Sequence, residues 1–278
     1  MIIRVPGSSA NLGPGFDTLG LAVGRYAEAG TDADAMPDGA SLVDEHHPAA
    51  KAFRLAGGVG PLWLRSRLPM GRGLGYSGAV RVAGILAGRL HSSGRGEITA
   101  DDRSAAVELG AELEGHPDNV AASVYGGVVA SAGGFVVPVP LAVTPGLVVW
   151  VPPFTTSTDS SRSRLPEVVT YADAVFNVGR TALLVAALAT GRTDALRAAT
   201  ADRLHQDRRL GAAEPSRTAI EAALGAGAWC AWLSGSGPTV AAFCDPADTA
   251  RVAASLPPDG VAHVLEIDTA GAMVVRPS

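Results

Sequence analysis

The chain has 278 residues, of which 47% are hydrophobic and 18% charged, so it can bury a sizeable core and is not a disordered chain. Its net charge of −5 argues against a nucleic-acid binder, because such proteins usually carry a basic face. Cys230 and Cys244 have neither metal-ligand nor redox spacing, no apolar run reaches the roughly 20 residues that span a bilayer, and the N-terminus lacks an apolar signal segment, so we expect a cytoplasmic protein without a membrane partner.

The hydrophobic pattern predicts an α+β chain in two parts, with a boundary near 140–146 that divides it into domains 1–145 and 146–278. The first part is predicted to contain a strand at 1–5, a turn-rich loop at 6–20, a fading strand at 21–30, a polar loop at 30–47, a helix at 48–56, a strand at 61–69, helices at 79–93 and 101–115, and two strands within 124–143. The second part is predicted to contain a strand at 146–153, a polar loop at 155–166, helices at 172–191, 194–206 and 216–227, a strand, a loop and a further strand or helix at 228–244, and strand character at 261–275.

The most informative segment is a glycine-rich loop at 69–79. Gly71, Gly73 and Gly75 alternate, so backbone N–H groups can face one anion, and the helix that follows adds its positive end. This combination suits a triphosphate, although a tight strand-to-helix turn has the same pattern. The loop lacks the Gly-Lys-Ser/Thr of a Walker motif, the signatures of protein kinases and a Rossmann fingerprint.

Two further loops have a similarly constrained backbone. The segment LSGSGPT at 233–239 forms a rigid loop with free N–H groups, and SSANLGPGFD at 8–17 carries Asn11 and Asp17 between Gly and Pro residues, as a site for a small polar substrate would. In this order the three loops resemble the three motifs of the GHMP kinases, and within that superfamily the chain looks most like the homoserine kinases. The segments that carry the second resemblance are SSANLGPGFDTLGLA at 8–22, EGHPDNVAASVYGG at 114–127, FNVGRTALLVAALATG at 176–191, DRLHQ at 202–206 and LSGSGPTVAAF at 233–243.

The resemblance covers nearly the whole chain except residues 24–60, and it implies a two-domain fold. The N-terminal domain would resemble the second domain of ribosomal protein S5, and the C-terminal domain would be ferredoxin-like. It implies ATP and Mg²⁺ as cofactors and the hydroxyl of L-homoserine as acceptor, with a homodimer left open. Another small alcohol as acceptor and a catalytically weak ligand-binding relative are the alternatives. The residues that the resemblance assigns to ATP are Pro69, Gly71, Arg72, Gly73, Leu74, Gly75, Tyr76, Ser77, Gly78, Ser234, Gly235, Ser236 and Gly237.

The predicted magnesium ligands are a serine and a glutamate. Ser77 stands where the glycine loop meets its helix, so its hydroxyl is a candidate ligand, and the same position suits an N-cap serine. Glu108, Glu112 and Glu114 lie on one predicted helix, where the first two share a face. The resemblance favours Glu112 as the second ligand, whereas Glu108 and Glu114 fit a solvated helix face.

The block HPDN at 116–119 is the predicted catalytic segment. Asn119 is expected to bond the amino or hydroxyl group of the acceptor. Asp118 is the candidate base, by resemblance to mevalonate kinases, although positioning and electrostatics can carry phosphoryl transfer without a base. His116 is expected on the substrate side, where it would fix the loop by a hydrogen bond rather than shuttle a proton.

An amino-acid acceptor carries a carboxylate, which a bidentate arginine suits, and an ammonium group, which anionic or amide oxygens suit. The resemblance implies that Arg162 and Arg209 clamp the carboxylate, with Arg164 and Arg208 as adjacent alternatives. The family usually has Pro-Tyr before the second arginine, where this chain has Asp207-Arg208. The residues implied at the ammonium end are Asn11 and Asp17.

The chain departs from the family pattern in its nucleotide region. Tyr76 replaces the first serine of the usual Gly-Leu-Gly-Ser-Ser, and a stretch is missing between Val23 and Leu62. A ring among the phosphates would block them, so Tyr76 must turn toward the core or toward the base and ribose. A ring near the base predicts weak discrimination between ATP and GTP.

Overall fold

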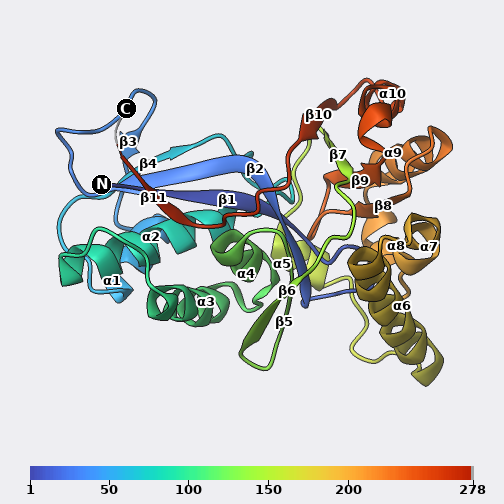
Figure 1. Ribbon diagram of the computed structural model, residues 1–278, viewed down its shortest axis with the longest axis horizontal. Coiled ribbons are helices and arrows are strands. Elements are labelled where there is room, and N and C mark those ends of the chain that lie inside the picture. The colour runs from blue at the N-terminus through green and yellow to red at the C-terminus, as the bar shows by residue number, and fades with distance from the viewer. Residues whose placement is uncertain (277–278) are drawn as a thin grey trace.

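The computed structural model describes residues 1–276, apart from the side chains of residues 158 and 159, and two antiparallel sheets organise it (Figure 1). The seven-stranded sheet contains β1 (Ile2–Ala10), β2 (Leu19–Gly30), β3 (Ser41–Leu42), β4 (Trp63–Ser66), β5 (Val128–Ala132), β6 (Phe135–Val139) and β11 (Met273–Val275), in the order β11-β1-β2-β4-β3 with β5 pairing β2 and β6. The four-stranded sheet contains β7 (Gly146–Val151), β8 (Cys230–Leu233), β9 (Val240–Cys244) and β10 (Val261–Leu265), in the order β10-β7-β9-β8.

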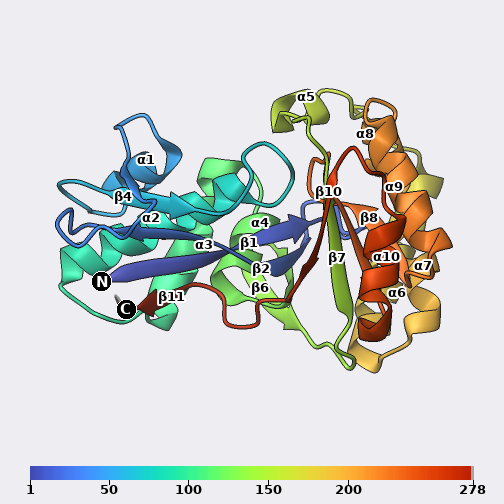
Figure 2. The ribbon, with the colours of Figure 1, turned by 90° about the horizontal axis from the view of Figure 1, so that it is seen from above.

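Helices cover one face of each sheet. Below the first sheet in Figure 1 lie α1 (Pro48–Leu55), α2 (Tyr76–Ser93), α3 (Ala100–Glu114) and α4 (Asp118–Tyr125), and both α2 and α4 contact β1 and β2. Beside the second sheet, as Figure 2 shows, lie α9 (Glu214–Gly225) and α10 (Thr249–Ser255), which follows a 3-10 turn at Pro246–Asp248. The remaining helices are α5 (Thr158–Arg162), α6 (Tyr171–Thr190), α7 (Thr193–Ala199) and α8 (Gln206–Leu210).

The predicted α+β class is confirmed, and the differences from the predicted elements have local causes. The first strand continues to Ala10, because small residues that suggest a turn instead pair along β2, with Ser8 opposite Ala22. The predicted helix at 194–206 is two helices, because the Asp202 carboxylate accepts the backbone N–H groups of residues 204–206 and starts α8 anew. The polar loop at 155–166 contains the short α5, and HPDN, which follows the helix predicted at 101–115, opens α4.

The proposed division near residue 145 falls between β6 and β7, which belong to different sheets. The last strand crosses this division: β11 pairs with β1, with Val275 opposite Ile2. A division by sheets therefore returns residues 273–275 to the N-terminal part. Figure 1 accordingly shows both chain ends on the side of the first sheet.

By length and composition alone, α6 could cross a bilayer, and 22% of its most apolar window is buried. Its inner face packs on the C-terminal domain, where the Asn177 amide donates to Asp202 (2.7 Å) and to the Pro14 carbonyl (3.3 Å). Its outer face exposes Val175 and Val178. A helix that uses a buried amide to join two loops is typical of a folded domain.

Candidate active site

A cavity of about 310 Å³ lies where the glycine loop before α2 meets the loops around the second sheet. Most residues predicted from the sequence line it. They are Asn11, Asp17, Pro69, Gly71, Arg72, Gly73, Gly75, Tyr76, Ser77, Gly78, His116, Asp118, Asn119, Arg162, Arg209, Gly235 and Ser236.

Leu74, Ser234 and Gly237 were predicted to bind ATP, but they do not line this cavity and instead hold the loops together. Leu74 is only 1% exposed, because its side chain packs in the core. Ser234 donates its hydroxyl proton to the Gly73 carbonyl (2.5 Å). Gly73 has φ 77°, and a Cβ there would lie 2.4 Å from the Ser234 carbonyl oxygen and 3.0 Å from that of Gly237, so only glycine permits this approach of the two loops.

The N-terminus of α2 faces the cavity without a side-chain cap. Gly75 occupies the N-cap position with φ 66°, and a Cβ there would lie 2.1 Å from the Ser8 hydroxyl oxygen. The first backbone N–H groups of an 18-residue helix therefore remain available at its positive end. This is the arrangement that binds phosphate groups in other proteins.

The structure brings Glu114, and not Glu112, to Ser77. Residues two apart on a helix point about 200° from each other. Glu114 accordingly lines the cavity, whereas Glu112 is exposed and borders a separate hollow between α1, α2 and α3. The Arg81 guanidinium contacts both the Ser77 hydroxyl and the Glu114 carboxylate from behind the cavity. The structure therefore places Glu114, and not the predicted Glu112, at the cavity with Ser77.

Tyr76 turns away from the glycine loop toward α1. Its half-buried ring packs against the N-terminal core and also lines the cavity, and its hydroxyl lies 3.2 Å from His47 Nε2. His47 Nδ1 accepts the Ala49 backbone N–H (3.1 Å), so Nε2 carries the ring proton and donates to Tyr76. Burial lowers the pKa of His47 below its usual value, which favours this neutral form. The ring thus turns toward the core, one of the two predicted directions, while part of it also lines the cavity.

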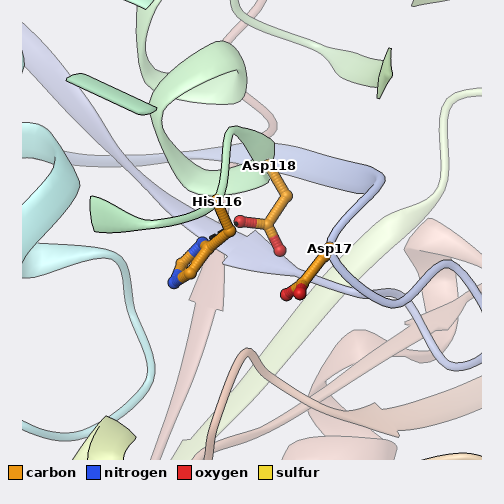
Figure 3. Close-up of side chains that lie close together, drawn as sticks. All are labelled: Asp17, His116 and Asp118. Carbon is orange, nitrogen blue, oxygen red and sulfur yellow. Dashed lines mark hydrogen bonds and ion pairs between the residues drawn. The ribbon is translucent and has the colours of Figure 1, made fainter. Parts of the chain in front are cut away.

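Two carboxylates and an imidazole converge on one side of the cavity (Figure 3). The ligand atoms of Asp17, His116 and Asp118 all lie within 4.8 Å of one another. His116 Nδ1 is 2.6 Å from Asp118 Oδ1, which also accepts the Asn119 backbone N–H (2.7 Å). Figure 3 shows the other Asp118 oxygen directed toward Asp17. The carboxylates of Asp17 and Asp118 therefore give this side of the cavity negative charge, which suits a cationic group.

The two asparagines of the site are held by neighbouring loops. Asn119 Oδ1 accepts the Ser8 hydroxyl proton (2.9 Å). Asn11 Nδ2 donates to the Gly235 carbonyl (3.0 Å), and its Oδ1 accepts the Asp17 backbone N–H (3.1 Å). Asn11 therefore shapes the loop that carries Asp17, in addition to lining the cavity.

The structure selects Arg162 and Arg209 from the four candidate arginines. Both line the cavity, whereas Arg208 is exposed and Arg164 borders a neighbouring hollow. Arg162 donates to Asp17 Oδ1 (2.6 Å). Arg209 is 5% exposed and donates to the Gly235 carbonyl (3.1 Å). Burial, together with the positive charge of Arg162, lowers the pKa of Arg209 to about 10, so at neutral pH two cations face one cavity.

The sequence pattern indicated no functional role for four residues around the site, namely Glu114, His47, Phe16 and His205. Glu114 could have been chosen from the helix period only if the inward face of α3 had been known. His47 lies in the segment 24–60, where no motif was recognised in the sequence. Phe16 and His205 belong to segments that carried the resemblance, SSANLGPGFDTLGLA and DRLHQ, so their positions were marked although their roles were not.

Comparisons with known proteins place this geometry in a family. The family models for the GHMP kinases N terminal domain and for GHMP kinases C terminal match residues 41–127 and 184–260. The chain is 42% identical to a homoserine kinase of Streptomyces avermitilis, over 98% of this chain and 95% of that protein, and 40% identical to one of Thermus thermophilus, over 95% of each.

Solved structures show the same fold. A homoserine kinase from Cytophaga hutchinsonii superposes with a TM-score of 0.83 at 24% identity, covering 99% of this chain and 97% of that one. A putative homoserine kinase from Listeria monocytogenes superposes with a TM-score of 0.79 at 29% identity, covering 99% of each chain. A mevalonate kinase, at 12% identity and a TM-score of 0.69, shares the fold over 97% of this chain and 99% of that one.

Proposed function

The chain belongs to the GHMP kinase family, and we propose that it transfers the γ-phosphate of ATP to the hydroxyl of L-homoserine. The observation that carries this proposal is that one cavity contains both charged side chains suited to a zwitterion and the uncapped N-terminus of α2, which suits a phosphate. The charged side chains are those of Arg162, Arg209, Asp17 and Asp118. Arginines at one end and carboxylates at the other match the charged groups of an amino acid. The relatives named homoserine kinase, similar over nearly their whole length, support the same substrate.

The homoserine carboxylate would bind Arg209 and Arg162, and its ammonium group would bind Asp17, which Asn11 positions. The free site already contains the interaction that this exchange replaces, because Arg162 donates to Asp17. A zwitterion gives each partner a new group of the opposite charge. Neutral alcohols such as simple diols lack both charges, so they would leave the Arg162–Asp17 pair in place.

Ser77 and Glu114 would hold Mg²⁺. A hydroxyl and a carboxylate are oxygen ligands of the kind that this cation prefers. Glu114 lines the cavity and its Oε1 atom pairs with the Arg81 guanidinium, so Mg²⁺ would share this carboxylate with that arginine. When bound, the cation would neutralise charge on the phosphate oxygens.

The protein's own part in the reaction is mainly positional. The γ-phosphate would lie against the N–H groups at the start of α2, with Asn119 holding the homoserine hydroxyl. The hydroxyl oxygen forms the new bond to phosphorus as the bond to the ADP oxygen breaks, and the hydroxyl proton leaves. Asp118 is the carboxylate beside Asn119 that can accept this proton, directly or through water.

The test is a coupled assay of ADP release with a panel of alcohols at fixed Mg²⁺ and ATP. We expect turnover with L-homoserine, and phosphorus NMR should identify O-phospho-L-homoserine as the product. L-serine, L-threonine and (R)-mevalonate serve as controls. Turnover with one of these and none with homoserine would reject homoserine as the substrate and retain the family.

A further inference from the structure

The ring of Phe16 lies against both arginines of the carboxylate site. The central guanidinium carbon of Arg162 lies 5.4 Å from the ring centroid, and that of Arg209 lies 5.2 Å from it. The face of an aromatic ring carries partial negative charge and attracts cations at this distance. One ring therefore touches the two positive groups that the substrate carboxylate must reach together.

His205 continues this support on the protein side. Its imidazole stacks on Phe16 with centroids 5.0 Å apart and an interplanar angle of 27°. The Nε2–H group donates to the Gly13 carbonyl (2.7 Å), so the unprotonated Nδ1 accepts a hydrogen bond from Arg209 Nη1 (3.2 Å). Asp202, which accepts the His205 backbone N–H (2.8 Å), fixes the segment itself. Neutral His205 is thus a fully determined acceptor for Arg209.

Two like charges close together need such support. Arg162 and Arg209 repel each other, and Arg209 is almost entirely removed from water. In the free protein Arg162 has Asp17 as a counter-charge, whereas within residues 1–276, the side chains of 158 and 159 excepted, Arg209 donates hydrogen bonds only to His205 and the Gly235 carbonyl. The neutral ring and the neutral imidazole therefore supply the contacts that keep both guanidinium groups converged on the cavity.

We infer that Phe16 and His205 are positioning residues that confer preference for a carboxylate-bearing acceptor, by holding Arg162 and Arg209 together. This inference rests on the proposed function. Phe16 does not line the cavity, so it acts through the arginines and not by touching the substrate. Phe16 lies in SSANLGPGFD at 8–17 and His205 in DRLHQ at 202–206, two family-like segments, and the proposed chemistry otherwise gives neither residue a role.

The test compares aromatic and aliphatic residues at position 16. Phe16→Leu should raise the KM for L-homoserine about tenfold or more while kcat and the KM for ATP change less than about twofold. Phe16→Tyr, which keeps the ring, should stay near wild type. A competitor without the carboxylate, 2-amino-1,4-butanediol, should keep its inhibition constant in every variant, because it makes no use of the arginines.

Phe176→Leu is the matched control. The guanidinium carbons of Arg180 and Arg203 lie 4.7 and 4.0 Å from the centroid of the Phe176 ring. This substitution therefore removes a comparable pair of cation–π contacts that lies outside the cavity. It should change no kinetic constant. If Phe16→Leu does not fold, Phe16→Met takes its place, since methionine fills irregular space without an aromatic face.

The outcomes separate this inference from the function on which it rests. Calorimetry of L-homoserine binding and the turnover assay on wild-type protein test the function first, and failure of both overturns the function and this inference with it. If wild type binds and phosphorylates homoserine, an unchanged KM in Phe16→Leu or Phe16→Met overturns this inference alone. Equal weakening of homoserine and 2-amino-1,4-butanediol also overturns it, because that result indicates a general loss of loop structure.

Discussion

The pair Glu114→Gln and Glu112→Gln tests the metal assignment with the same chemical change on opposite faces of α3. Glutamine keeps the size of glutamate and removes one negative charge. Glu114 is 10% exposed and faces the cavity with Ser77, whereas Glu112 is exposed on the other side. Only the first change removes charge from the place where Mg²⁺ would be held.

The expected magnitude follows from that placement. Losing one preorganised charge at a phosphoryl-transfer site should lower kcat by roughly 10²-fold or more. Glu114→Gln should also lower the free energy of unfolding by about 1–3 kcal/mol, because Arg81, half-buried behind the site, loses its ionic partner. Glu112→Gln should change the free energy of unfolding by less than about 0.5 kcal/mol, and kcat by less than about twofold.

The assay is ADP release at saturating ATP and homoserine over a range of Mg²⁺ concentrations, with Mn²⁺ binding measured by electron paramagnetic resonance in the presence of a non-hydrolysable nucleotide. Denaturant unfolding confirms that each variant is folded at the assay temperature. The assignment of Glu114 is refuted if Glu112→Gln is the more damaging change. It is equally refuted if folded Glu114→Gln binds Mn²⁺ as wild type does.

Three further outcomes are expected. Arg209→Ala should weaken homoserine binding by roughly 2–4 kcal/mol and exceed the effect of Arg162→Ala, while ATP binding holds; equal loss of both substrates would indicate phosphate-binding arginines. Wild type should discriminate weakly between ATP and GTP in competition, and Tyr76→Ser should alter the ratio, whereas strong ATP preference unchanged by the substitution contradicts a ring near the base. The free energy of unfolding should fall as the pH drops below 6.5, the ordinary pKa of histidine. Burial lowers the pKa of His205 in the folded protein, so the unfolded chain binds a proton at a higher pH than the folded chain does. Denaturant titrations at two pH values measure this last effect, and greater stability in acid would contradict it.

The parts of the site that backbone chemistry dictates could be predicted from the sequence. The alternating glycines of the phosphate loop have a physical reason in their spacing, and the structure brings that loop to the cavity. Arg209, which the family resemblance indicated, lines the cavity, although Asp207-Arg208 departs from the usual family residues before it. Its burial separates it from the exposed Arg208, and burial of one arginine in a consecutive pair cannot be read from a polar stretch.

The parts that depend on which face of an element looks inward could not be predicted. Glu112 and Glu114 differ only in their direction from α3, and that direction is set by the packing of α2 and α4 against it. The helix predicted at 101–115 ends at Gly115, with φ 81°, but the pattern did not indicate that HPDN begins a new helix after Pro117. The Tyr76–His47 contact joins the glycine loop to a polar segment in which no motif indicated a role, although the model of the GHMP kinases N terminal domain matches from residue 41 onward.

The order expected for the two arginines follows from what each loses when homoserine binds. The Arg162–Asp17 pair is about one-third exposed on both sides, so solvent weakens it and its rupture costs about 1 kcal/mol or less. Arg162 therefore exchanges one carboxylate for another at little gain. Arg209 is buried and positively charged, and in the described part of the chain it donates hydrogen bonds to neutral acceptors, so the substrate carboxylate would give it an anionic partner. Most of the affinity for the carboxylate should then reside in Arg209. If Arg162→Ala weakens homoserine binding more than Arg209→Ala does, Asp17 does not compete appreciably with the substrate carboxylate for Arg162, and this reasoning is wrong.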